Sequence, residues 1–286
     1  MKKVRSIVVT ALMLLAAIIY AVFFLIEPGV DFAGGDLTVT FIDVGQGDSI
    51  LIQQGSNAIL IDSGAFHQRE RVINTLDSLG VTYLDYVIAT HPHADHMGAM
   101  NAIIDTYDIG HVMMPNAINN TVAFERMLES IANKGLRIEH PVPGRSIVAG
   151  NIELEIVAPN SERYSNLNNH SIITRLGWGE TSFLFTGDAE VLSENEVLEN
   201  GFNISADVLD VGHHGSSTST SENFLDAVSP ELAILSLAAD NMYGHPHVEV
   251  MERLEARNIT VYRTDTMGTI ILRSDGTNIS VTTERW

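Results

Sequence analysis

The residues best suited to chemistry lie in the stretch "ATHPHADHMGAM", residues 89–100, which contains His91, His93, Asp95 and His96. Imidazole nitrogens and carboxylate oxygens together suit zinc, manganese or iron. His91 and His93 are two residues apart with Pro92 between them, which favours a loop, because ligands on one helix face are usually three or four residues apart. We therefore interpret this stretch as a metal-binding loop.

Elements around the loop would position it at one edge of a sheet. The apolar run 84–90 predicts a buried strand that ends at the cluster, and 97–107 predicts a helix whose N-terminus would add its dipole. Other predicted strands end on compatible side chains, namely Asp62, Asp188, His213, His214, His245 and His247. Asp43 and Asp48 fall near the same edge, either as ligands or as buried turn-forming acids.

The remaining pattern predicts an α/β fold. β-branched and apolar runs predict strands, and segments with helical spacing, such as 68–80 and 120–135, alternate with them. Each half begins with hairpins and ends with alternating strands and helices, so two mixed sheets packed together with helices outside would accommodate the chain. We expect one domain over residues 37–286.

The N-terminus predicts a membrane segment. Residues 6–26 are 21 positions without a charge, which is long enough to span a bilayer as a helix, and "MKKVR" precedes them. The positive-inside tendency puts Met1 in the cytoplasm and the domain outside. We expect residues 1–29 to form a membrane anchor and the start of a linker. The alternative is a signal segment, removed on secretion.

Composition narrows the chemistry and the partners. The 286 residues include no cysteine, which excludes disulfides, thiolate catalysis and cysteine-ligated zinc. The net charge is −20, and such a surface repels phosphate backbones unless salt or bound cations intervene. No basic nucleic-acid patch is evident in the sequence.

Longer motifs resemble a known family. "HPHADH", preceded by "LIDSG" and followed by "FTGD" and a later histidine, resembles the metallo-β-lactamase superfamily. More narrowly, "FIDVGQGDSILIQ", "VLDVGHHGSSTSTSENFLDAVSPELAILS" and "NMYGHPHVEVMERL" resemble the extracytoplasmic hydrolase domain of ComEC-type DNA-uptake proteins, over about residues 37–284. The multi-pass channel region of those proteins is not matched, so we do not expect a DNA-conducting pore. The resemblance implies an αββα sandwich.

The resemblance also implies a site with two divalent metal ions, zinc or manganese. His91 and His93 would hold the first metal, Asp95 and His96 the second, Asp188 would bridge them, and His213 would complete the second site. Asp62 and His214 would orient ligands by hydrogen bonding. The superfamily commonly has a further first-metal histidine before the "GD" strand, where related domains tend to carry asparagine. His170 either restores that ligand or lies on the surface.

The implied activity is hydrolysis by metal-activated water. Asp95 would orient or deprotonate the water, and His213 or His245 would protonate the leaving group, with His245 alternatively a late ligand. The first hypothesis is a phosphodiesterase, with single-stranded DNA as a candidate substrate and a link to DNA uptake. The alternatives are hydrolysis of a small ester, lactone or lactam, and a non-catalytic membrane-tethered binding module. The sequence does not indicate an oligomeric state.

Overall fold

The strands alternate their side chains between two apolar environments. The computed structural model describes residues 35–285. In β1 (Leu37–Phe41), the side chains of Leu37, Val39 and Phe41 enter the core between two sheets. In β10 (Thr181–Phe185), Phe183 and Phe185 enter the same core, whereas Leu184 packs on the other face. A strand with two apolar faces is buried on both sides, so each sheet needs a covering layer.

Two mixed sheets form the centre of the fold. The first has the order β15-β14-β1-β2-β3-β4-β5-β6, with β2 (Ile50–Gln54), β3 (Asn57–Ile61), β4 (Tyr83–Ile88), β5 (Asp108–Met113), β6 (Ile138–Glu139), β14 (Ile270–Ser274) and β15 (Ile279–Thr283). The second has the order β13-β12-β11-β10-β9-β8-β7, with β7 (Ser146–Ala149), β8 (Ile152–Ile156), β9 (Thr174–Trp178), β11 (Val208–Asp210), β12 (Leu232–Leu235) and β13 (Thr260–Arg263).

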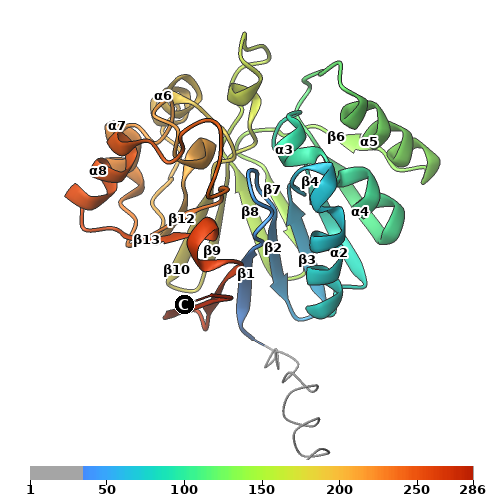
Figure 1. Cartoon of the computed structure of the whole chain (residues 1–286), viewed down its shortest axis with the longest axis horizontal. Helices are drawn as coiled ribbons and strands as arrows, with labels where there is room; N and C mark the ends of the chain where they lie inside the picture. The colour runs from blue at the N-terminus through green and yellow to red at the C-terminus, as the bar shows by residue number, and fades with distance from the viewer. Residues whose placement is uncertain (1–34, 286) are drawn as a thin grey trace, which may run out of the picture. The chain divides into compact units, whose positions relative to one another are not determined.

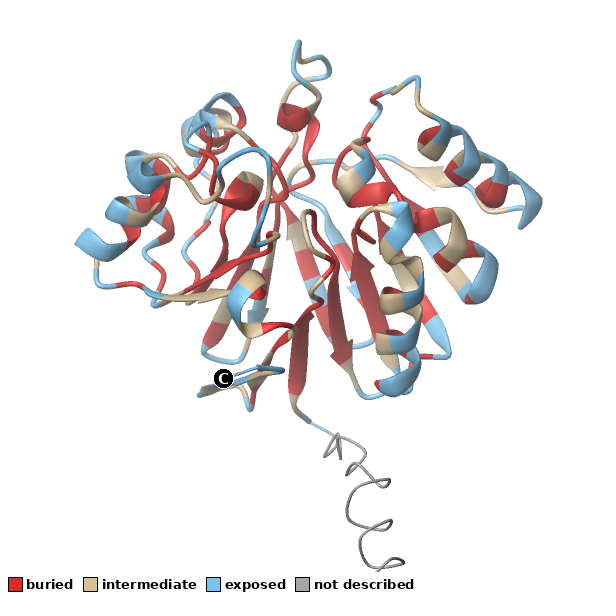
Figure 2. Cartoon of the chain, in the orientation of Figure 1, coloured by how far each residue is buried: buried red, intermediate tan, exposed pale blue. Residues whose placement is uncertain are grey.

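Helices cover the outer face of each sheet (Figure 1). The first sheet carries α2 (Arg69–Ser78), α4 (Met100–Thr106) and α5 (Val122–Asn133), and the second carries α6 (Val191–Glu199), α7 (Glu222–Val228) and α8 (Val248–Ala256). A one-turn α9 (Thr264–Met267) follows β13. Figure 2 shows the burial concentrated in the strands and on the inner sides of these helices. The αββα sandwich expected from the sequence is therefore confirmed.

Parallel pairing brings several strand ends to one edge. β3 runs parallel to β4 in the first sheet, and β10 runs parallel to β11 in the second. The carboxyl ends of parallel neighbours lie at the same edge, so the loops that follow these strands meet. One local detail differs from expectation: a one-turn helix, α3 (Ala94–Met97), begins inside the histidine-rich stretch that was predicted as a loop.

The predicted membrane segment, 6–26, lies outside the described residues. Over residues 35–285, no helix has both the length and the apolar character needed to cross a bilayer. The compact unit that contains the described residues runs over Ala33–Trp286.

Candidate metal centre

Five loops deliver titratable side chains to the shared sheet edge. Asp62 follows β3 directly, His91 follows β4, Asp188 follows β10, and His214 lies in the turn η3 (Gly212–Gly215) after β11. Asp48 precedes β2. All five side chains are buried, Asp48 with 4% of its surface exposed and the others with less. Burying so many ionisable groups together is costly unless they are paired or bind a metal.

His91, His93 and Asp188 form a first cluster. Their potential ligand atoms all lie within 4.8 Å of one another. His91 Nε2 lies 2.9 Å from His93 Nδ1 and 3.6 Å from Asp188 Oδ2. Burial, with the positive charge of His96, lowers the pKa of His91 well below its usual range. The ring is therefore neutral and has a lone pair available for a cation.

Asp48, His96, Asp188 and His214 form a second cluster. His96 Nδ1 lies 2.8 Å from Asp62 Oδ2, and His214 Nδ1 lies 2.8 Å from the Ser236 carbonyl oxygen. These oxygens accept hydrogen bonds, so in both neutral rings the proton is on Nδ1. When both rings are neutral, their Nε2 atoms face each other at 3.2 Å with lone pairs that neither can satisfy.

Asp188 contributes one carboxylate oxygen to each cluster. Its Oδ1 lies 3.1 Å from His96 Nε2 and 3.4 Å from His214 Nε2, whereas Oδ2 faces His91. Within the described chain, the buried Oδ1 has no hydrogen-bond partner. Facing imidazole lone pairs beside an unpartnered carboxylate oxygen fit a bound cation, and the N/O ligand set suits a divalent transition metal. The residues present therefore fit two metal ions that share Asp188.

The second cluster holds protons when no ion is bound. Burial opposes a charged ring, but the Asp188 and Asp62 carboxylates raise the pKa of His96 well above its usual range. Burial likewise opposes charge on His214, and Asp188 and Asp48 raise its pKa. For Asp188, burial is outweighed by His96 and His214, and its pKa falls well below the ordinary value. Metal binding here must displace protons from the two rings.

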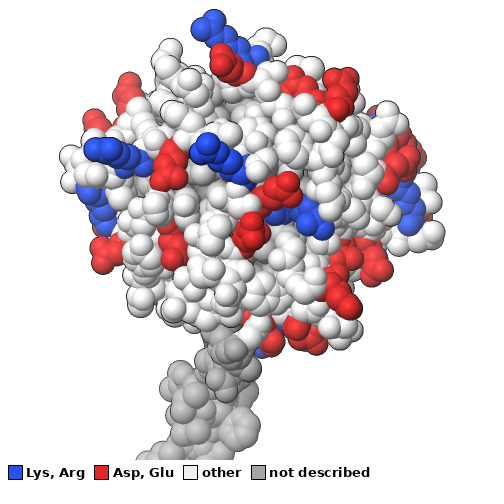
Figure 3. All heavy atoms as spheres, turned by 180° about the vertical axis from the view of Figure 1, so that it is seen from behind, with Lys and Arg blue, Asp and Glu red and all other residues white. Residues whose placement is uncertain are grey.

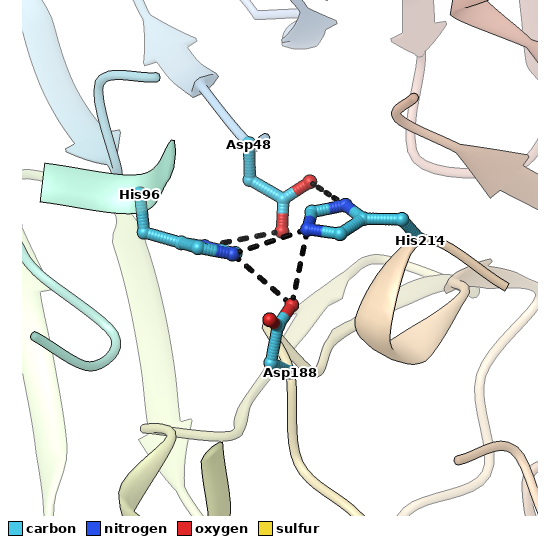
Figure 4. Close-up of side chains that lie close together, drawn as sticks. All are labelled: Asp48, His96, Asp188 and His214. Atoms are coloured by element: carbon cyan, nitrogen blue, oxygen red, sulfur yellow. Dashed lines mark hydrogen bonds and ion pairs between the residues drawn. The ribbon is translucent and has the colours of Figure 1, made fainter. Parts of the chain in front are cut away.

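Asp48 and Asp62 act on the far edges of the histidine rings. Figure 4 shows Asp48 and Asp188 on opposite sides of the His96–His214 pair. Asp48 lies 3.6 Å from His96 Nδ1 and 3.5 Å from His214 Nδ1, so its nearest contacts are with the Nδ1 edges. Asp62 accepts hydrogen bonds from the Thr90 N–H at 2.8 Å and the Thr90 hydroxyl at 2.6 Å, which fix the carboxylate that orients His96.

The loop that carries Asp48 approaches the histidine-rich stretch very closely. Gly47 has φ +125, and a Cβ built on it would lie 2.0 Å from the Asp95 carbonyl oxygen. Only glycine fits this contact and this backbone angle. The sequence is compatible with Asp48 as a metal ligand or as a turn-forming acid, and the glycines of "GQGD" are its signal for a close approach of the backbone. Asp43 instead pairs with Arg285 and accepts from the Gly45 N–H.

Asp95 lies at the margin of the second cluster. Its Oδ2 is 3.7 Å from His214 Nε2, and the side chain is 32% exposed. Burial raises the pKa of this carboxyl, but the hydrogen bond to His214 and the charge of His96 outweigh burial and lower it. Asp95 is therefore ionised at neutral pH, and it is more accessible to solvent than Asp188, His96 and His214.

The backbone of η3 determines which of two adjacent histidines enters the second cluster. His213 has φ 53 and His214 has φ 57, so both are left-handed, an arrangement uncommon for residues other than glycine. The structure places His214 in the second cluster. His213, expected there from the resemblance, instead lies 3.7 Å from Asp188 Oδ2 on the side of the first cluster. Its Nδ1 pairs with the Thr218 hydroxyl at 3.0 Å.

His170 is turned away from both clusters. It ends the short helix η2 (Leu167–His170), where its Nε2 accepts from the Tyr164 N–H at 3.3 Å and its ring packs on the Tyr164 ring. Asn168, two residues earlier, lies closer to the site, since its Nδ2 is 3.4 Å from His213 Nε2. Asn168 is buried, and its Oδ1 has no partner within the described residues.

His245 lies beside the two histidines of η3. Its ring centroid lies 5.5 Å from that of His213 and 6.4 Å from that of His214. Burial and the charges of His213, His214 and His247 lower the pKa of His245 to about 4, so the ring is neutral at pH 7. Its buried Nδ1 has no hydrogen-bond partner among the described residues, which leaves that atom free for a bound molecule.

The sequence of this chain matches a protein family and two competence-related proteins. The profile of a family described as "Metallo-beta-lactamase superfamily" matches residues 42–239. ComE operon protein 3 of Bacillus subtilis is 33% identical over 255 residues, which cover 82% of this chain and 33% of that protein. Competence protein ComA of Neisseria gonorrhoeae is 29% identical over 237 residues, covering 82% of this chain and 32% of that protein. The chain thus spans about a third of the length of these relatives.

Solved structures share the fold at low sequence identity. The metallo-beta-lactamase fold protein YhfI from Bacillus subtilis superposes with a TM-score of 0.54 at 12% identity, covering 79% of this chain and 95% of that one. A diphosphatase from the PhnP family superposes with a TM-score of 0.51 at 15% identity, covering 84% and 98%. At these identities the likeness concerns the fold alone.

Proposed function

Because this chain belongs to the metallo-beta-lactamase superfamily, we propose that it is a phosphodiesterase that uses two divalent metal ions, zinc or manganese. The observation that carries the proposal is Asp188, whose two carboxylate oxygens face two separate ligand clusters. His91 and His93 would hold one ion, and His96, His214 and Asp95 the other. Two ions held there would lower the pKa of a water between them and neutralise phosphodiester oxygens.

The surrounding side chains then have distinct tasks. Asp95 is ionised and partly exposed, so it can accept a hydrogen bond from the attacking water and orient it. His245 is neutral, so it would assist the leaving group by donating a hydrogen bond from an N–H rather than as an imidazolium. His213 lies between His245 and Asp188, where it can contact a bound phosphate. Asp62 holds His96 in its ligand tautomer.

The relatives favour a nucleic-acid substrate in DNA uptake. Two of them carry the names "ComE operon protein 3" and "Competence protein ComA". We infer that the domain acts on DNA outside the cytoplasm and is tethered by residues 6–26 as a membrane anchor, with secretion after cleavage as the alternative. These assignments rest on the relatives and on the sequence.

Metal content and substrate choice test the proposal together. The full chain is purified, its bound zinc, manganese and iron are measured, and hydrolysis of single-stranded DNA, bis(p-nitrophenyl) phosphate and a β-lactam is assayed. We expect two ions per chain and cleavage of the phosphodiesters. Cleavage of the β-lactam alone would replace the proposed substrate class, and a chain that neither binds metal nor turns over any substrate with added metal would refute the proposal.

A further inference from the structure

Exposed aromatic rings gather at the edge that carries the metal centre. Among the described residues, the exposed aromatic side chains are Phe66, Tyr83 and Tyr243, at 40%, 43% and 58%. Tyr83 begins β4 and is therefore at the opposite end of that strand from the site. Phe66 follows Asp62 by four residues, and Tyr243 precedes His245 by two. Phe66 and Tyr243 therefore lie in the two segments that carry Asp62 and His245.

A continuous series of ring contacts connects Tyr243 to the site. The Tyr243 ring stacks on His245 with centroids 5.6 Å apart and an interplanar angle of 26°. The His245 ring meets His213 at 5.5 Å, and His213 Nε2 lies 3.7 Å from Asp188 Oδ2. The His245 ring packs on one face of the Tyr243 ring, and more than half of the Tyr243 surface is exposed to solvent. A flat group stacked on the open face of Tyr243 would thus be connected to Asp188 through three rings, those of Tyr243, His245 and His213.

Two arginine side chains lie over the Phe66 ring. The Cζ atoms of Arg69 and Arg126 lie 4.7 Å and 5.3 Å from its ring centroid, an arrangement favoured by cation–π attraction. Arg69 is paired with Glu70, whereas Arg126 forms no salt bridge within the described part of the chain. Phe66 is held close to α3, since its backbone nitrogen would lie 2.8 Å from a Cβ at Gly98.

Charge alone is a weak source of affinity for nucleic acid in this protein. The net charge is −20, and on the face seen in Figure 3 the basic side chains are scattered among acidic ones. Stacking of bases on aromatic rings needs no net positive charge and is available to unpaired bases, because each presents a π-face. Duplex bases are already stacked on one another and cannot use it without being flipped out.

We propose that Tyr243 stacks on a base of an unpaired nucleic-acid strand and that Arg126 contacts a backbone phosphate of the same strand. The proposal rests on the phosphodiesterase function above and specifies its substrate. Tyr243 is a substrate-positioning residue, and Arg126, on α5 and beside the Phe66 ring, contributes a phosphate contact. The strand would cross the site with the bond to be cleaved between these two contacts.

Binding is measured apart from cleavage. The full chain is stripped of metal with a chelator, its fold is checked by circular dichroism, and its affinity for a dye-labelled oligothymidylate is determined. Tyr243→Ala should weaken binding about tenfold, the scale of one stacked base, and Tyr243→Trp should restore it. Tyr83→Ala, which removes a tyrosine that is 43% exposed at the opposite end of β4, should leave affinity unchanged. An abasic strand of equal length should bind the wild type about as weakly as oligothymidylate binds Tyr243→Ala.

The salt dependence separates the two contacts. Arg126→Gln should reduce the slope of log affinity against log salt by about 0.7, the contribution of one phosphate contact on a single strand. Tyr243→Ala should lower the affinity without changing that slope. Equal wild-type affinity for abasic and normal strands, or no loss in Tyr243→Ala, would overturn the proposal.

Failure of this inference is distinct from failure of the proposed function. Base-dependent binding by a protein that never cleaves a phosphodiester would support the inference and refute the phosphodiesterase. Phosphodiester cleavage together with binding that does not depend on bases would support the phosphodiesterase and refute the inference. Absence of both binding and cleavage would refute both proposals.

Discussion

The two sheets contribute to the metal centre in different ways. The first sheet supplies His91, His93, Asp95 and His96 within six consecutive residues after β4. The second sheet supplies Asp188 and His214 singly, from loops after β10 and β11 that are 26 residues apart in the sequence. A contiguous set is recognisable in the sequence and positioned by one loop. A dispersed set depends on how two separate strands pair and on how each loop turns.

The difference extends to the electrostatics of the histidines. His91 follows β4 of the first sheet, and burial lowers its pKa so that the ring is neutral. His96 and His214 face each other across the two sheets, and the carboxylates of Asp188, Asp62 and Asp48 favour protons on both. The charged histidines and carboxylates of the site are therefore concentrated where the two sheets meet. Asp188 contributes a carboxylate oxygen to both clusters.

Removal of the shared carboxylate should have the largest effect. Asp188→Asn keeps the shape but removes the negative charge that both clusters use, so we expect loss of both ions and a fall in hydrolysis well beyond the 10- to 100-fold typical of outer partners. Metal analysis and phosphodiester kinetics measure the change. Asp105→Asn, an exposed carboxylate on α4, is the control. Retention of two ions by Asp188→Asn would show that the two clusters are independent.

Substitution of the adjacent histidines of η3 should have the next largest effect on metal content and hydrolysis. His214 faces His96 and Asp188, so His214→Gln should lose about one ion of the two and most activity. His213→Gln should keep both ions, because its Nδ1 pairs with Thr218 and its Nε2 stands farther from Asp188. Parallel metal analysis of the two variants compares them directly. The opposite ranking would restore the ligand assignment that the family resemblance implies for His213.

This pair also shows what could be predicted from the sequence. Two mixed sheets with helices outside followed from the apolar runs and the helical spacing, because strand and helix periods are local. The αββα sandwich itself was what the family resemblance implied. The edge at which polar residues gather followed from their positions after predicted strands. Which of His213 and His214 enters the second cluster could not be predicted from the sequence. Both residues have left-handed backbone angles that redirect their side chains, and residue spacing does not reveal such angles. The place of Asp48 likewise depended on the long-range approach of Gly47 to Asp95.

The pH dependence of metal binding should differ between the clusters. The pKa values of His96 and His214 are raised, so their protons stabilise the metal-free protein below about pH 6.5, and that contribution is lost as pH rises through the raised values. An ion needs the same lone pairs, so affinity at the second cluster should increase with pH, by up to tenfold per unit for each proton released. His91 is already neutral, so the first cluster should change less.

Calorimetry and thermal unfolding can separate these contributions. Metal titration in buffers of different ionisation enthalpy should show proton release, and that release should disappear in His214→Gln. Between about pH 6 and about pH 8, the melting temperature of the chelated protein should fall while that of the loaded protein rises. Parallel curves with and without metal would contradict the assignment of the raised pKa values to the ligand rings.

The smallest effect is expected at His170. The sequence left this residue open as a first-metal ligand, but the structure directs its Nε2 to the Tyr164 N–H and its ring onto Tyr164. His170→Gln should therefore keep both ions and change hydrolysis less than twofold, with a stability loss of about 1 kcal/mol from the hydrogen bond. Asn168→Ala is the informative partner, because the Asn168 side chain contacts His213 and its Oδ1 is unpartnered. If His170→Gln loses an ion while Asn168→Ala does not, the loop before β9 must rearrange when metal binds, and the contribution of the second sheet would include a third residue.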